Sequence, residues 1–253
     1  MIPALAAAVI PALVLPWLLL PLRNPILFTV LPVVPLAVVY ARAISDRRPR
    51  FAATLALLWA LALTISTVAA SARSPEAAMR AIWHAGEYRD EMLFWISTGS
   101  GAEGSIARFL PRVLVEYVLV LGLSAATAGA GALLLGALLL GYMNGYVGWV
   151  VAHADPASPP LYAALLAWPP WPIARVVSFV LAGTWGAAWG YPRILALFGA
   201  GRRERARIAP LLVASLAFLV LDIVLKWWLA PVWRGFLRAL LGASAGIEAG
   251  GSG

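Results

Sequence analysis

The sequence predicts an all-α, polytopic membrane protein: a transmembrane helical bundle of six or seven spans with amphipathic helices at the membrane interface. The 253 residues are 62% hydrophobic and only 12% charged, whereas soluble domains are about one quarter charged. Mean hydropathy is +0.87. Residues 117–154 hold no Asp, Glu, Lys or Arg and are long enough to cross a bilayer twice. Lipid is therefore the expected solvent for most of this chain.

The distribution of charge and the absence of cysteine exclude several classes of function. The net charge is +8, and Lys226 is the only lysine, so arginine carries almost all of the positive charge. The arginines fall between apolar spans rather than on one basic face, which predicts topology determinants and contacts with anionic lipid, not nucleic-acid binding. Because cysteine is absent, disulfides, thiolate catalysis and cysteine metal sites are excluded.

Hydropathy divides the chain into a hairpin, a core and a tail. Residues 1–50 are rich in proline and are expected to form an N-terminal membrane hairpin; two straight crossings and one bent hairpin both remain open. Residues 51–245 form the membrane core, and 246–253 form a tail that ends like a flexible linker. The seven predicted spans are 2–22, 25–42, 51–71, 109–128, 131–152, 173–196 and 207–231.

One helix break follows from length alone. The 44 residues from Arg108 to Val151 are almost uniformly apolar, and as a single helix they would be about 65 Å long at 1.5 Å per residue. That is twice the thickness of a bilayer. A turn is therefore predicted at Gly129–Gly131.

Two arginine clusters set the predicted orientation. One lies in 42–50 and the other in 202–207, and the positive-inside rule places both in the cytoplasm. Seven spans in a cell membrane then put the N-terminus inside and the C-terminus outside. Arg234 and Arg238 oppose this assignment mildly, since they fall on the outer side.

The outer segment 72–108 has an ordinary soluble composition. Ser74-Pro75-Glu76 is a helix start, with a capping hydroxyl, proline in the first turn and an acid near the positive helix end. A second short helix is predicted over 88–96, and both should lie on the membrane surface. The bulky apolar side chains of this segment are expected to be exposed and to dock a protein partner; they are Trp83, Phe94 and Trp95.

Four ionisable residues lie inside predicted spans, where charge is a functional hypothesis by default. They are Glu116, Arg175, Asp222 and Lys226. One interpretation is local: Glu116 pairs with Arg112, and Asp222 with Lys226, which extends outward past Trp227 and Trp228. The other is that all four converge on one neutral cluster in the outer half of the bundle.

Small residues predict where helices touch closely. Gly141, Asn144, Gly145 and Gly148 share one span, and Gly186 and Gly190 lie in the next. Glycines four apart let helices approach, and the asparagine can hydrogen-bond across the contact. These two spans are therefore expected to form the tight core. A homodimer through the Gly141–Gly145 face is a further hypothesis.

The remaining features bear on re-entrant structure and on catalysis. Residues 161–166 are apolar and too short to cross, and prolines follow at 169–172; a re-entrant half-helix and a loop with interfacial tryptophans both remain open. The two histidines, His84 and His153, are expected to be interfacial. No catalytic motif, metal-ligand spacing or nucleotide-binding loop occurs, so we expect no enzyme activity, cofactor or metal.

The order of features over 51–231 resembles the stage II sporulation protein M family: one span, an outer segment, then four spans. The residues that carry this resemblance are Asn144-Gly145 with Gly148, the triplet Leu181-Ala182-Gly183, and Pro231 at the end of the last span. The resemblance implies a membrane scaffold in an envelope-remodelling complex, without catalytic activity.

This chain also departs from the family pattern. It has Pro170-Trp171-Pro172 where the family commonly has Pro-His-Gly, Arg175 where an acid would stand, and Lys226 in place of a glutamate. Two acids have become bases, which puts in doubt any ion or proton role. The alternative function is a membrane subunit of a transporter or channel, suggested by the outer-half cluster and by a half-helix near 161–171.

Overall fold

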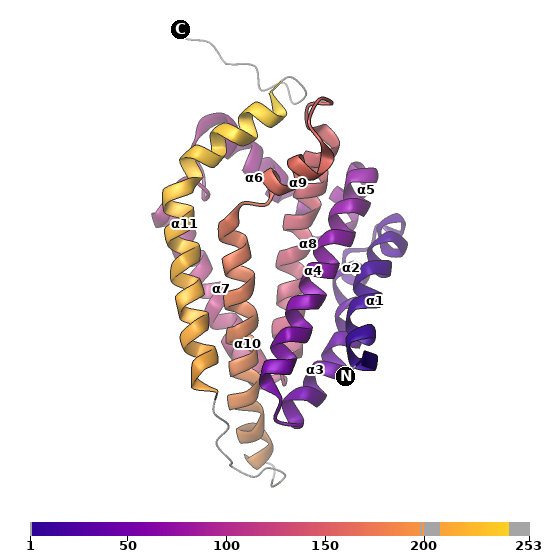
Figure 1. The fold of residues 1–253 in the computed structure, drawn as a ribbon, viewed down its shortest axis with the longest axis vertical. Helices are drawn as coiled ribbons and strands as arrows, with labels where there is room; N and C mark the ends of the chain where they lie inside the picture. The colour runs from indigo at the N-terminus through magenta and orange to yellow at the C-terminus, as the bar shows by residue number, and fades with distance from the viewer. Residues whose placement is uncertain (1, 198, 200–207, 243–253) are drawn as a thin grey trace.

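The computed structural model describes residues 2–197, 199 and 208–242, and their regular structure is helical. Within these residues, seven helical segments are long and apolar enough to cross a membrane. This confirms the all-α bundle (Figure 1). The segments are α1 with the short 3-10 helix η1 (Ile2–Leu19, Leu20–Leu22), α2 with α3 (Pro25–Val30, Val33–Ser45), α4 (Pro49–Arg73), α7 (Ile106–Ala126), α8 (Ala130–His153), α10 (Pro170–Leu197) and α11 (Ala209–Leu241).

Three shorter helices lie at one end of the bundle, near the end of α11 (Figure 1). They are α5 (Pro75–Ala81), α6 (Ala85–Thr98) and α9 (Pro160–Ala167). Pro75 and Glu76 occupy the first turn of α5 as expected, but Ser74 makes no side-chain capping bond. We call residues 75–105, that is α5, α6 and the connection to α7, the interfacial module.

The N-terminal hairpin consists of two helical legs. α1 continues through Pro11 and Pro16, and the second leg is interrupted between α2 and α3 at residues 31–32. The turn places Arg23 in the left-handed region, and the Asn24 side chain then caps α2 by accepting bonds of 3.1 Å from the amides of Ile26 and Leu27. The hairpin packs along α4, where the Trp59 indole donates to the Pro32 carbonyl at 3.0 Å.

The predicted turn between the fourth and fifth spans is confirmed. α7 ends at Ala126, and Ala128 and Gly129 both have positive φ, 53° and 97°. A β-carbon at Gly129 would collide with the Tyr40 ring, so glycine is required there both by its conformation and by this close approach. The Thr127 hydroxyl accepts a 2.7 Å bond from the Gly131 amide and thereby starts α8.

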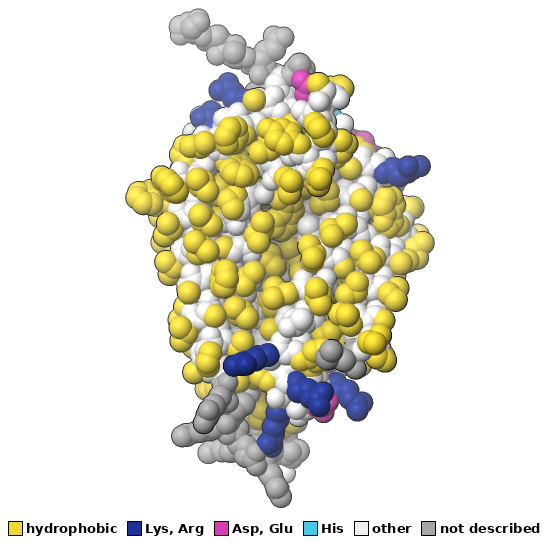
Figure 2. Space-filling view, viewed as in Figure 1, with side chains coloured by type: hydrophobic (Ala, Val, Ile, Leu, Met, Phe, Trp, Pro, Cys, Tyr) yellow, Lys and Arg dark blue, Asp and Glu magenta, His cyan; other side chains and the backbone are white. Residues whose placement is uncertain are grey.

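The outer surface of the bundle is apolar, and a minority of polar side chains is buried within its largely hydrophobic interior. Hydrophobic side chains cover its flank, and the charged ones gather toward the two ends (Figure 2). Interhelical hydrogen bonds account for several buried hydroxyls: Tyr117 meets Ser215 at 2.9 Å, Ser178 and Ser215 exchange bonds with each other's carbonyls, and Tyr40 donates to Thr184 at 3.0 Å. This is the pattern expected where lipid contacts the outer surface.

The glycine-rich spans pack tightly, but not mainly on each other. A β-carbon at Gly148 would lie 2.8 Å from the Val68 carbonyl of α4, whereas one at Gly190 would lie 2.7 Å from the Ala125 Cα of α7. Gly186 likewise faces Leu121 and Ser124 of α7. The two spans predicted to form the tight core thus make their closest contacts with other helices: α8 packs mainly on α4, and α10 on α7 and α11.

The Gly141–Gly145 face is covered within the chain. β-Carbons at these two positions would lie 3.2–3.3 Å from Ile82 and Ala85 of the interfacial module. Any homodimer through this face would have to displace α5 and α6. Asn144, which lies between the two glycines, is fully buried and donates a 3.2 Å bond to Thr64 of α4. Asn144 therefore hydrogen-bonds across the contact between α8 and α4, not across the Gly141–Gly145 contact with α5 and α6.

One arginine cluster can be located in the fold and the other cannot. Residues 42–50 join α3 to α4 at the end of the bundle where α10 ends and α11 begins (Figure 1). The second predicted cluster, 202–207, and the tail 246–253 lie outside the described residues. We call this end of the molecule the basic end; it is opposite the interfacial module.

Candidate functional site

A buried ion pair joins the two last spans. Arg175, near the start of α10, donates two hydrogen bonds to the Asp222 carboxylate of α11, of 2.9 and 3.2 Å. The Asp222 side chain is fully buried, and that of Arg175 is 17% exposed. The bidentate geometry is the strongest that a guanidinium and a carboxylate can adopt. Asp222 therefore pairs with Arg175 and not, as the local interpretation had it, with Lys226.

Lys226 has a partner that sequence spacing did not identify. Its ammonium lies 2.8 Å from a carboxylate oxygen of Glu103 and 4.4 Å from the centre of the Phe109 ring. The Lys226 side chain is only 2% exposed, so the expectation that it extends outward past Trp227 and Trp228 is wrong. Those two tryptophans are themselves largely exposed on the surface of α11.

The third ion pair is the one that local spacing predicted. Arg112 lies 3.1 Å from Glu116 one turn later on α7. It also approaches Glu91 of α6 at 3.8 Å and donates to the Tyr142 hydroxyl of α8 at 3.3 Å. The Arg112 side chain is half exposed. This group therefore forms the partly exposed margin of the site, between the interfacial module and α7.

The three pairs together hold as many acids as bases. The members are Arg175 with Asp222, Lys226 with Glu103, and Arg112 with Glu116. A neutral arrangement is what a low-dielectric interior requires. The four predicted residues thus belong to three ion pairs, and two of these pairs also use residues outside that set, Glu103 and Arg112.

The connection that carries Glu103 is itself fixed to α11. Gly99 ends α6 in the left-handed conformation, φ 78°, as C-terminal glycines commonly do. A β-carbon there would lie 2.6 Å from the Arg234 guanidinium. That guanidinium donates 2.9 Å bonds to the carbonyls of Ile96 and Ser97. Arg234, which opposed the positive-inside assignment, therefore binds the open carbonyl end of α6, where a cation is favoured.

Aromatic residues fill the space between the module and α8. The Tyr88 ring lies 4.8 Å from that of Tyr142 and 5.6 Å from that of Tyr146, centre to centre. Burial, reinforced by the negative charge of Glu103, raises the pKa of the Tyr88 phenol well above its usual range. The phenol therefore stays neutral.

The segment 160–172 turns inward. α9 packs on both α8 and α11; after it, the Trp168 indole donates a 3.1 Å bond to Asn144 in the buried part of α8. Trp171 is 1% exposed. The Trp233 indole of α11 donates to the Leu166 carbonyl at 2.7 Å. Of the two alternatives, the contacts favour a short helix that returns into the bundle over a loop with interfacial tryptophans.

The three residues expected to dock a partner differ in exposure. Trp83 is 47% exposed and Phe94 is 53% exposed, but Trp95 is 1% exposed. Trp95 packs in the core with Met92 and Ile96, so its assignment to a docking surface is wrong. Phe94 lies on the open face of α6, which also carries Glu87, Asp90 and Thr98.

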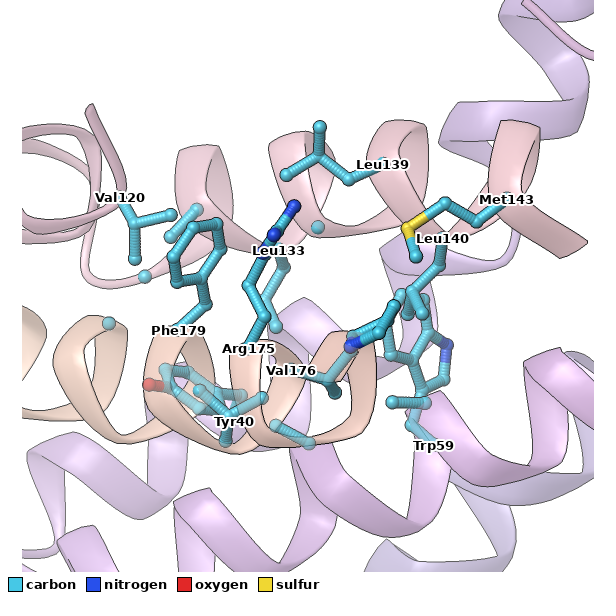
Figure 3. Close-up of a pocket in the computed structure, with 18 residues that line it drawn as sticks. Tyr40, Trp59, Val120, Leu133, Leu139, Leu140, Met143, Arg175, Val176 and Phe179 are labelled. Carbon is cyan, nitrogen blue, oxygen red and sulfur yellow. The ribbon is translucent and has the colours of Figure 1, made fainter. Parts of the chain in front are cut away.

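An apolar cavity lies on the other side of Arg175. It has a volume of about 70 Å³ and is surrounded by α3, α4, α7, α8 and α10. Tyr40, Trp59, Leu140 and Phe179 are among its lining residues, and Arg175 extends from α10 along its margin (Figure 3). Most of its lining side chains are apolar. The charged cluster is therefore bounded on this side by an apolar compartment.

The chemistry available to these groups is limited. Across the part of the chain that the structure describes, no three His, Asp or Glu side chains are grouped so that they could hold a metal ion. His84 is engaged by Glu87, and the His153 ring stacks on Trp149 with its centre 4.2 Å away. The ion pairs connect elements that are distant in the sequence. No protein-family model, curated protein or solved structure matches the chain.

Proposed function

We propose that the protein is a non-catalytic membrane scaffold that presents its interfacial module to a protein partner on the outer side of a cell membrane. The observation that carries this proposal is the anchoring of the module to α11. Glu103 pairs with the buried Lys226, and Arg234 binds the carbonyls at the end of α6. A rigid surface loses less entropy on binding than a mobile one, so it binds a partner more tightly.

The exposed side of the module offers a suitable surface. Trp83 lies beside His84, with ring centres 6.0 Å apart, and His84 pairs with Glu87 on the open face of α6. Phe94 extends the same face one turn beyond Asp90. Exposed aromatic residues surrounded by mixed charges are typical of protein interfaces. The resemblance to the stage II sporulation protein M family adds a context, a complex that remodels the cell envelope.

A co-purification experiment tests this function. The full-length protein is isolated from native membranes as wild type, as the double variant Trp83→Ala/Phe94→Ala, and as Trp227→Ala/Phe236→Ala. The second pair removes one exposed Trp and one exposed Phe from α11 instead. A partner bound through the module should be lost only from the first variant. Equal recovery of every associated protein from both variants would refute the docking function.

The alternative function, a membrane subunit of a transporter or channel, is favoured by one observation. The apolar cavity is lined in part by α10, the inward-turning α9 precedes α10 in the chain, and Arg175 of α10 carries a charge into the bundle. Half-helices and buried charges mark the pathway in many transporters. This alternative predicts that wild-type liposomes release potassium, chloride or protons faster than empty liposomes and that Asp222→Asn changes the rate. Identical rates with and without protein would count against it.

A further inference from the structure

A basic groove opens at the end of the bundle opposite the interfacial module. It has a volume of about 860 Å³ and lies where α1 begins, α3 meets α4 and α11 begins. Four exposed arginines, Arg42, Arg47, Arg48 and Arg50, line it, and Asp46 is the acid among its described lining residues. Arg42, Arg48 and Arg50 together with Asp46 carry a formal charge of +2. Figure 2 shows Lys and Arg side chains gathered at this end.

Asp46 does not neutralise the groove. Its carboxylate lies 3.9 Å from Arg42 Nε, and both side chains are more than half exposed. Such a surface pair is weak. The other acidic residues in the described part of the chain lie away from this groove. Most belong to the interfacial module, whereas Glu116 and Asp222 lie within spans and Asp155 follows α8 at the opposite end. The local excess of positive charge therefore attracts an anion.

The same groove has an apolar wall. Val39 of α3, Phe51 of α4 and Leu211 of α11 line it together with the arginines. Neither α4 nor α11 receives a side-chain cap at its start, so their first amides add partial positive charge at this rim. A ligand that fits both surfaces must be amphipathic, with an anionic group next to hydrocarbon.

A second, wholly apolar groove adjoins the first. It has a volume of about 510 Å³ and runs between α1 and α4, from Ile2 to Leu13 on one side and from Leu58 to Ile65 on the other. Both grooves include the beginning of α1: Ala4 lines the basic groove, and Ile2 and Leu5 line the apolar one. Twelve helical residues on α1 provide a track of roughly 16 Å along the bilayer, which suits an acyl chain.

We propose that these two grooves form one binding site for an anionic phospholipid, with the phosphate among the arginines and an acyl chain between α1 and α4. Juxtamembrane arginine clusters attract anionic lipid, and the adjoining hydrocarbon track distinguishes a phospholipid from a free phosphate ion. The site lies at the opposite end of the bundle from the docking surface, so it does not depend on the scaffold function.

Native mass spectrometry of the purified full-length protein tests the site. Phosphatidylglycerol and phosphatidylcholine with identical acyl chains are added separately, and the bound fractions are compared. The wild type should prefer phosphatidylglycerol. Arg42→Gln/Arg48→Gln/Arg50→Gln should lower phosphatidylglycerol affinity roughly tenfold or more. The control Arg80→Gln/Arg108→Gln/Arg238→Gln removes three exposed arginines at the other end and should retain the preference.

Two further measurements separate a lipid from a phosphate ion. Ala6→Phe, which fills the apolar groove, should weaken phosphatidylglycerol binding while the arginines remain in place. Millimolar inorganic phosphate should not displace the lipid. Displacement by phosphate, or an Ala6→Phe variant that binds like the wild type, would overturn the assignment to a phospholipid. A preference retained within twofold by the triple variant would overturn the basic site itself.

Discussion

Lys226 and Glu103 are 123 residues apart in sequence, and their charged groups meet at 2.8 Å in the interior of the molecule. Lys226 belongs to the last span, whereas Glu103 lies in the connection between α6 and α7. The pair therefore ties the interfacial module to a transmembrane helix. A buried pair of this kind adds little net stability compared with apolar residues, but loss of one partner leaves the other charged and desolvated.

Neutralising one member of this pair should therefore be far more harmful than replacing both. Lys226→Met or Glu103→Met alone is expected to lower the free energy of unfolding by about 3–5 kcal/mol, whereas Lys226→Met/Glu103→Met should restore most of the loss. Unfolding by dodecyl sulfate in mixed micelles measures all three. Glu87→Gln is the control, because that side chain is 79% exposed and should change stability by less than about 0.5 kcal/mol. Additive losses in the double variant would contradict a direct pairing.

The Arg175–Asp222 pair allows a different test. Asp222→Asn keeps the size of the side chain but leaves the buried Arg175 guanidinium without its counter-charge. We expect a loss of about 3 kcal/mol and faster amide exchange along the contact between α10 and α11. Hydrogen exchange read out by mass spectrometry would locate the effect. Increased exchange confined to the interfacial module, with α10 and α11 unchanged, would mean that the pair does not hold these two helices together.

The close helix contacts predict which glycines tolerate alanine. Gly148→Ala and Gly190→Ala would force α8 off α4 and α10 off α7, because the new methyl group meets backbone atoms. Each should cost about 1–3 kcal/mol. Gly136→Ala on α8 and Gly122→Ala on α7 are the controls, since a β-carbon at either position has no neighbour within 4 Å. Thermal unfolding in detergent compares the four variants. Equal melting temperatures for all of them would contradict the packing.

Local sequence patterns were sufficient to predict the membrane spans and one of the three ion pairs. The apolar segment Arg108 to Val151 is 44 residues long, and as one helix it would be twice as long as a bilayer is thick. Two spans with a turn between them, α7 and α8, could therefore be predicted from its length. Arg112 and Glu116 are four residues apart on one helix, and that spacing alone brings them together.

Contacts between segments that are distant in the sequence could not be predicted from local patterns. Glu103 belongs to a Gly-rich connection, and nothing in its own surroundings indicates that α11 carries its partner. Trp95 and Phe94 are neighbours of the same chemical type, and only the rotation of α6 against α8 decides that one is buried and the other exposed. The bases at positions 175 and 226 are each matched by an acid from another segment.

Labelling of single cysteines tests the orientation, because the chain contains no native cysteine. The positive-inside rule puts the basic end in the cytoplasm and the interfacial module outside. Ser45 and Ser100 are exposed at these two ends. In intact cells a membrane-impermeant maleimide should label Ser100→Cys, and it should label Ser45→Cys only after permeabilisation. Labelling of Ser45→Cys alone in intact cells would reverse the orientation and place the docking surface in the cytoplasm.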